Sequence, residues 1–336
     1  MAHSSVLQSA LAALILVGVS AAVTNVSAQN RRLPNPYRED PHWATIPDGV
    51  KPATIVGAGS IVGADPAANG DVWVLRRSDP PILRLDRSGK VVKSFGDGLF
   101  VQAHGLTVDR DGNVWVTDAQ FKDGKGNQVF EFSPDGKMLM TLGKAGVAGG
   151  GTDVFSGACD VVVAANGDIF VADGHDDNVP INRIMKFSKD GTFIKAWGTR
   201  GSGPGEFNLP HSIAMDSRGR IFVADRGNNR IQIFDPDGRF IDQWKQFGRP
   251  SGVFIDKNDT IYVADSQSNS KLNPGFARGI RIGSARDGTV TAMVPWVETD
   301  PEKSNNAGFE NVGADVNGNV LGSEVTSQTL RRFVKR

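Results

Sequence analysis

The chain has 336 residues, and its 37 lysines and arginines balance its 37 aspartates and glutamates. Without excess charge it is a poor match for nucleic acid or for an anionic membrane surface, so neither partner is expected. Its single cysteine, Cys159, excludes intrachain disulfides, so the stability of the fold must come from its core.

The N-terminal segment has the pattern of a targeting sequence. Residues 1–28 contain no lysine, arginine, aspartate or glutamate, and an apolar stretch runs from Ala10 to Val23. The stretch is too short to span a membrane comfortably, and small residues lead up to Ala28. We therefore predict a signal peptide that is cleaved after Ala28, with export to the periplasm or the extracellular space and no membrane association after cleavage. A retained anchor is the alternative.

Residues 29–42 are polar and proline-rich, which predicts a flexible leader. Beyond them the chain repeats one fifteen-residue pattern, seen most clearly as HGLTVDRDGNVWVTD. The copies occupy residues 104–118, 159–173, 211–225, 251–265 and 310–324, and a looser copy ends at Arg76.

Each copy has two alternating apolar runs separated by a tight turn, which is the sequence form of a β-hairpin. A third alternating run follows every copy, and the first four copies have a fourth run, such as VVKSFG at 91–96. Six units of four strands predict an all-β fold, a six-bladed β-propeller with antiparallel blades.

The sixth unit ends at Arg336 after only three strands, so its outer strand must come from elsewhere. We predict that Trp43 to Ile46 supplies it and that this N-terminal strand closes the ring, which leaves no exposed sheet edge. The propeller is then expected to span residues 43–336.

The first position of the repeat indicates a metal site. His104, His211 and Glu310 occupy it in blades two, four and six, so they are expected to converge on the axis from three directions. Two histidines and a carboxylate suit one divalent ion, zinc above all, although iron, manganese or cobalt would also fit. The alternative is that they are polar residues bonded to channel water. Cys159 shares the position and is read as a small buried residue.

Three further candidates follow the last position of the repeat on the same face. Arg77, His175 and Arg226 are expected to surround the metal. Guanidinium groups bind carboxylates in a bidentate manner, so a small carboxylate-bearing or peptide substrate is expected. For Arg226, a salt bridge to an acid of a neighbouring blade is an equal alternative.

Residues 43–336 resemble the peptidyl-alpha-hydroxyglycine alpha-amidating lyases and, more broadly, the NHL-repeat propellers. The resemblance rests on FGDGLFVQAHGLTVDRDGNVWVTD and FNLPHSIAMDSRGRIFVADRGNNRIQIF, with WATIPDG upstream. It implies that His104 and His211 bind zinc and that Arg77 and Arg226 handle substrate. A third metal histidine of that family corresponds to Glu310 and its catalytic tyrosine to His175.

The resemblance also implies a reaction, in which a metal-dependent carbon-nitrogen lyase cleaves a peptidyl or N-acyl alpha-hydroxyglycine to an amide and glyoxylate. The metal would lower the pKa of the substrate hydroxyl, His175 would act as base, and Arg77 would hold the carboxylate. The resemblance leaves open whether the chain binds a structural calcium ion, since Asn311 replaces the aspartate that the family has at its calcium site. Two alternatives are a non-catalytic NHL-type propeller that binds a peptide or protein, and a metal-dependent hydrolase or lactonase.

Overall fold

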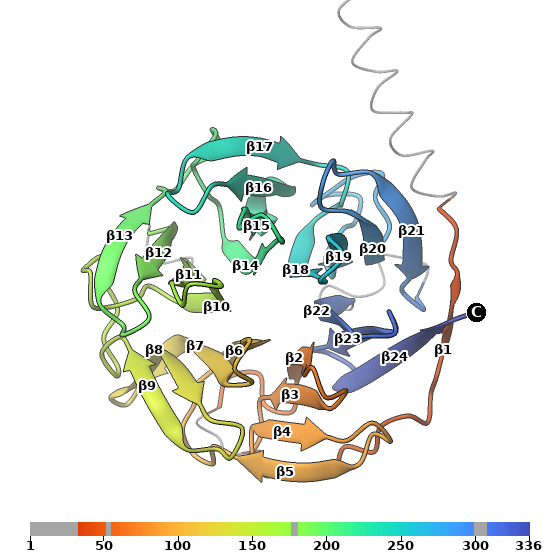
Figure 1. Cartoon of the computed structure of the whole chain (residues 1–336), viewed down its shortest axis with the longest axis horizontal. Coiled ribbons are helices and arrows are strands. Elements are labelled where there is room, and N and C mark those ends of the chain that lie inside the picture. Colours follow the sequence, from red (N-terminus) through yellow and green to blue (C-terminus); the bar gives the residue numbers. More distant parts are fainter. Residues whose placement is uncertain (1–32, 52–54, 176–180, 299–307) are drawn as a thin grey trace, which may run out of the picture.

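The computed structural model describes residues 33–51, 55–175, 181–298 and 308–336, and the predicted signal peptide lies outside them. The described residues form six four-stranded antiparallel sheets arranged in a ring (Figure 1). The predicted six-bladed β-propeller is therefore confirmed. Within these ranges, no helix has both the length and the apolar character that crossing a membrane requires.

The strands take the same order in every blade, from the axis outward. The inner strands are β2 (Ile61–Pro66), β6 (Ala103–Val108), β10 (Ala158–Val163), β14 (Pro210–Met215), β18 (Pro250–Ile255) and β22 (Phe309–Ala314). The second strands are β3 (Val72–Arg76), β7 (Val114–Lys122), β11 (Ile169–Asp173), β15 (Ile221–Asp225), β19 (Thr260–Asp265) and β23 (Val320–Glu324). The third strands are β4 (Ile82–Leu85), β8 (Lys125–Phe132), β12 (Arg183–Phe187), β16 (Arg230–Phe234), β20 (Gly279–Ser284) and β24 (Thr329–Lys335). The outer strands are β5 (Val91–Phe95), β9 (Met138–Leu142), β13 (Phe193–Trp197), β17 (Phe240–Trp244), β21 (Val290–Pro295) and β1 (Tyr37–Glu39), and one 3₁₀ turn, η1, covers Arg226–Asn228.

The burial of each strand follows from its place in the blade. The second strands β3, β11, β15 and β23 are buried at every residue, because neighbouring blades cover both of their faces. The outer strands β5 and β13 instead alternate between half-buried and exposed residues, since only one face packs on the blade. This difference explains why the inner runs of the sequence are the most apolar.

A β-bulge occurs at the start of every inner strand. In all six blades the pairing of the first strand with the second shifts register directly after the first paired residue. A bulge takes a residue out of regular pairing and re-aims its side chain. The residues at this point are Val62, His104, Cys159, His211, Ser251 and Glu310. The first position of the repeat is therefore the bulge position, and the predicted metal ligands all occupy it.

The ring is closed by an N-terminal strand, as predicted, but by a different segment. β1 pairs antiparallel with β24, with Tyr37 opposite Lys335, and the two lie side by side in Figure 1. The prediction that Trp43 to Ile46 forms this strand is wrong, because the Trp43 side chain is buried in blade one and its Nε1 donates to the carbonyl oxygen of Arg87 (3.0 Å). Part of the segment expected to be a flexible leader thus belongs to the propeller.

We expect Tyr37→Ala to destabilise the protein by roughly 3 to 5 kcal/mol, the usual cost of removing a buried aromatic side chain. Tyr37 is 3% exposed and packs in the core between blades five and six. Arg38→Ala is the matched control, because Arg38 is exposed on the same strand. Thermal unfolding measures both variants, and equal melting temperatures would contradict this account of closure.

Candidate metal centre

Three histidines meet where the inner strands begin. His104 and His211 are the second residues of β6 and β14, and His175 lies two residues beyond β11. A ring nitrogen of each lies within 4.8 Å of those of the other two. The ring centroid of His104 is 4.5 Å from that of His175 and 4.6 Å from that of His211. Imidazole is a common metal ligand, so this group could hold an ion.

Backbone carbonyls of the following blades orient two of these rings. Nδ1 of His104 lies 2.8 Å from the oxygen of Cys159, and Nδ1 of His211 lies 2.7 Å from the oxygen of Ser251. A carbonyl oxygen can only accept, so Nδ1 carries the proton and Nε2 keeps its lone pair. Both Nε2 atoms are buried; that of His104 has no hydrogen-bond partner, whereas that of His211 lies 3.2 Å from Oε1 of Glu310. Metal-binding histidines are usually fixed in this way by a partner on the other nitrogen, so the pair fits an ion.

Cys159 contributes through its backbone rather than its thiol. Its side chain is fully buried, as the sequence led us to expect. Its carbonyl can reach His104 because Gly105 has no side chain, since a Cβ on Gly105 would lie 2.6 Å from that oxygen. Glycine after the bulge is thus required for the close approach of blades two and three.

Burial favours the neutral form of the three imidazoles. Burial is the main cause that lowers the pKa of His104, His175 and His211. Charge repulsion adds to it, from the other histidines and Arg77 at His104 and from Arg226 at His211, while the carboxylate of Glu310 acts in the opposite direction on His211. Neutral imidazole is the form that binds metal, so burial favours the ligand state.

Glu310, the predicted third ligand, lies beside the histidine group. Its Oε1 is 3.2 Å from Nε2 of His211 and 3.4 Å from Nη1 of Arg226. Burial alone would raise the pKa of Glu310, but His211 and Arg226 hold it well below its usual range. Arg226 therefore has a carboxylate partner, but in blade six rather than in a neighbouring blade. His175, predicted to act on substrate, instead takes its place among the three clustered histidines.

Arg77 is held firmly at the same face. Its Nε donates to the carbonyl oxygen of Ala103 (3.0 Å), and its backbone N–H donates to that of Ser60. Gly57, at φ 71°, passes over the guanidinium, and a Cβ there would lie 2.8 Å from Nη1. Burial lowers the pKa of Arg77, yet an arginine side chain stays protonated in proteins. The site thus presents a fixed positive charge.

A cavity of about 150 Å³ opens above the histidines. Its lining residues are Arg77, Gln102, His175, Arg226, Ser266, Gln267, Glu310 and Val325. Four of these directly follow the second strand of a blade, namely Arg77, Arg226, Ser266 and Val325. The repeat pattern indicated the two arginines. Ser266 and Val325 follow the last position of the repeat in blades five and six and were missed. Gln102 and Gln267 were also missed, and no repeat position singles them out.

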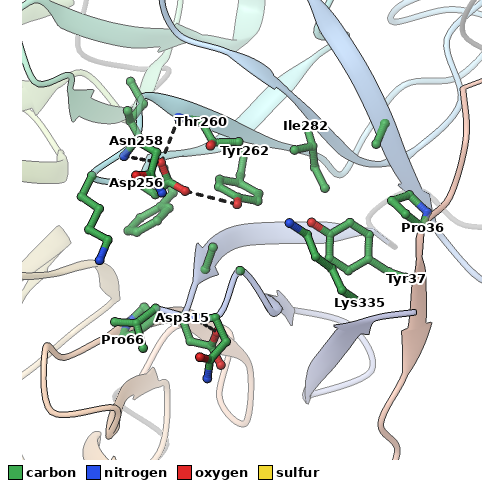
Figure 2. A pocket seen from close by; sticks show the side chains of 18 of the residues that line it. Pro36, Tyr37, Pro66, Asp256, Asn258, Thr260, Tyr262, Ile282, Asp315 and Lys335 are labelled. Atoms are coloured by element: carbon green, nitrogen blue, oxygen red, sulfur yellow. Dashed lines mark hydrogen bonds between the residues drawn. The ribbon is translucent and has the colours of Figure 1, made fainter.

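A larger cavity, of about 490 Å³, lies away from this chemistry. It is lined by the hairpin turns of blades five and six and by Tyr37, at the opposite ends of the inner strands from the histidines. Figure 2 shows Tyr262, whose hydroxyl donates to Oδ2 of Asp256 (3.5 Å). The tyrosine hydroxyl and the carboxylate are thus hydrogen-bonded to each other. The larger cavity volume therefore does not mark the candidate site.

Two buried carboxyl groups, Asp65 and Asp160, lie on the wall of a third cavity, of about 380 Å³. Burial raises the pKa of Asp65 to about 7, although Oδ2 accepts a hydrogen bond from the N–H of Val108 (2.7 Å). Burial also raises the pKa of Asp160 to about 6, and repulsion from Asp160 raises that of Asp65. Both carboxyl groups therefore keep their protons to a higher pH than exposed carboxyl groups do.

The chain is similar in sequence to proteins named for peptide amidation and for NHL repeats. The NHL repeat matches residues 207–234, and a family described as a 6-bladed beta-propeller matches residues 153–220. Over 217 residues the chain is 40% identical to peptidyl-glycine alpha-amidating monooxygenase B of Xenopus laevis, covering 59% of this chain and 24% of that protein. It is 37% identical to a probable peptidyl-alpha-hydroxyglycine alpha-amidating lyase of Caenorhabditis elegans, covering 49% of this chain and 45% of the relative. Human NHL repeat-containing protein 3 is 34% identical, with 62% and 59% covered.

These relatives confirm the resemblance seen in the sequence, and the alignments span less than two thirds of each relative's length. Solved structures show the fold alone. A streptogramin B lyase has a TM-score of 0.53 at 16% identity, covering 86% of this chain and 97% of its own. A gluconolactonase from Xanthomonas campestris has a TM-score of 0.57 at 16% identity, covering 83% and 87%.

We expect His175→Ala to purify folded but with much less bound metal than the unmodified protein, because it removes one of the three clustered nitrogens. His42→Ala is the matched control, since His42 is exposed and lies outside the group. Elemental analysis after loading with zinc measures the difference. Full metal content in His175→Ala would mean that the ion is held by His104, His211 and Glu310, as the sequence first suggested.

We expect Asp65→Asn to raise stability relative to the unmodified protein as the pH rises from 5 to 8. A carboxyl group with a raised folded-state pKa contributes stability fully below its unfolded value near 4 and loses that contribution as the pH passes through about 7. Asparagine keeps the acceptor but cannot ionise. Melting temperatures at both pH values test this, with the exposed Asp97→Asn as control. A difference that does not change with pH would contradict the raised pKa.

Proposed function

We propose that this chain, an NHL-type propeller related to peptidyl-alpha-hydroxyglycine alpha-amidating lyases, is itself a metal-dependent lyase. Its substrate would be a small N-acyl or peptidyl alpha-hydroxyglycine, and its products an amide and glyoxylate. The observation that carries the proposal is the group of three histidine nitrogens within 4.8 Å of one another, beneath a pocket that two arginines line. The names and the identity of the relatives add to it.

In this proposal His104, His175 and His211 hold a divalent ion, with zinc the best match to three neutral imidazoles. When bound, such an ion acts as a Lewis acid that lowers the pKa of the substrate hydroxyl. Zinc sites with three protein ligands keep a position open for substrate, which a catalytic role requires.

The two arginines would hold the carboxylate end of the substrate. Arg77 is fixed by the carbonyl of Ala103, so its guanidinium is oriented before substrate binds. Arg226 donates to Glu310 through Nη1, and the other N–H groups of its guanidinium can donate to a ligand. Holding the carboxylate fixes the carbon atom that bears the hydroxyl and the amide nitrogen, which favours reaction by orientation.

Glu310 is the best-placed group to take the hydroxyl proton. It lines the pocket as a carboxylate beside His211, whereas His175, predicted to be the base, is engaged as a ligand. Glu310 takes the hydroxyl proton as the carbonyl of glyoxylate forms and the carbon-nitrogen bond breaks; the amide nitrogen keeps the electron pair of that bond and receives the proton from Glu310, which gives the primary amide. In the proposal Glu310 is therefore the base and His175 is a metal ligand, which reverses the roles expected from the sequence.

The decisive assay is glyoxylate release from alpha-hydroxyhippurate by zinc-loaded protein. We expect release above the metal-free control, and we expect Arg77→Met to raise KM at least about tenfold, because a charge-assisted contact to the carboxylate is lost. Arg87→Met is the matched control, since Arg87 is exposed and bonds to the oxygen of Asn69.

No release from zinc-loaded protein would reject the lyase. Bound metal with hydrolysis of esters or lactones would instead favour a hydrolase. Absence of metal would favour a propeller that binds a peptide or protein without catalysis.

A further inference from the structure

We propose that Gln102 recognises the amide N–H of the substrate, so that the site selects N-acyl compounds over the corresponding esters. This rests on the proposed function in one respect, that the ligand is an alpha-substituted glycine. It adds a specificity-determining residue that the repeat pattern does not indicate.

The backbone holds Gln102 rigidly at the entrance to β6. Its N–H donates to Oδ1 of Asp118 (2.6 Å), and its carbonyl oxygen accepts from the N–H of Ala119 (3.0 Å). The next residue, Ala103, provides the carbonyl that orients Arg77. Gln102 and the guanidinium of Arg77 are therefore placed by the same short stretch of chain.

The Gln102 side chain is buried and yet lacks a partner. It is 6% exposed and lines the pocket above the histidines. Its Oε1 is buried without a hydrogen-bond partner. A buried acceptor without a donor is unfavourable, and the pocket is the place from which a donor can come.

The other side-chain oxygens that line this pocket are engaged or belong to Glu310, the proposed base. Oε1 of Glu310 faces His211 and Arg226, and Oε1 of Gln267 accepts from Nε of Arg249 (3.1 Å). The hydroxyl of Ser266 is paired with that of Ser251 (2.5 Å). Gln102 therefore offers a neutral acceptor that a ligand can use without breaking an existing contact.

The groups of the proposed ligand match this distribution. An N-acyl alpha-hydroxyglycine carries a carboxylate, a hydroxyl and an amide N–H. Arginine side chains only donate, so Arg77 and Arg226 suit the carboxylate, and the histidine group is the place for the hydroxyl. The amide N–H then remains for Oε1 of Gln102. An ester in the same place has no hydrogen to donate and leaves that oxygen unpaired.

A pair of non-reacting ligands tests this without turnover. Hippurate has an amide N–H, and O-benzoylglycolate replaces it with an ester oxygen. Binding of both to the zinc-loaded chain is measured by calorimetry. We expect the unmodified protein to bind hippurate about tenfold to a hundredfold more tightly, the range for one hydrogen bond to a buried acceptor. In Gln102→Met, which keeps the length but not the amide, the ratio should fall to near one.

Two further variants complete the design. Gln102→Glu keeps an acceptor, so both anions should bind more weakly while the preference for the amide persists. Gln128→Met, on β8 of the same blade and outside the pocket, should leave the ratio unchanged. Melting temperature and zinc content establish that each variant is folded and loaded.

Equal affinities of the unmodified protein for the two ligands would overturn the proposal, even if Gln102→Met does not fold. An unchanged ratio in folded Gln102→Met would also overturn it, as would an equal loss of both ligands, which would mean that Gln102 donates to the carboxylate. The outcome is independent of the lyase assay. Glyoxylate release together with equal affinities for the two ligands would reject the role of Gln102 alone. An affinity ratio that falls to near one in Gln102→Met, without glyoxylate release by the unmodified protein, would reject the lyase alone.

Discussion

The β-bulge at the first position of each inner strand is the feature on which the site depends. It occurs in all six blades, so it is a property of the repeat rather than of the site. In blades two and four the bulge residue is a histidine, and in blades three and five it supplies the carbonyl that orients that histidine. The same local geometry therefore provides both the ligands and the groups that hold them.

In blades two to six, a buried acid at the last position of the repeat supports this geometry. Asp118 accepts the N–H groups of Val101 and Gln102, and Asp173 accepts that of Ser156. These bonds join the end of the second strand to the chain that leads into the inner strand. Arg183 pairs with Asp173 at 2.9 Å, and similar arginines pair with the acids of blades four, five and six. Each of these four buried acids therefore has a charged partner, which offsets the cost of burying a carboxylate.

Fixed positive charge distinguishes the pocket beside the histidines. That pocket is lined by two arginines and one carboxylate, whereas the cavity that contains Asp65 and Asp160 is lined by acids together with Arg110 and Lys257. The excess of positive charge beside the histidines suits an anionic ligand. The fold does not decide this, because structures of the same architecture include a streptogramin lyase and a gluconolactonase. Function must be read from the residues of the site.

The sequence by itself determined the six blades and the candidate face, because alternation, tight turns and a repeated register are local properties of the chain. It also placed His104 and His211 together, since equivalent positions of a cyclic repeat must face a common axis. Only the tertiary structure decided that His175 joins them, because its direction depends on how the loop after β11 packs, with Gly174 at φ 150° against Pro210. The unpaired oxygen of Gln102 and the closing strand at Tyr37 were also decided only by the tertiary structure. Both depend on contacts between segments that lie far apart in the sequence.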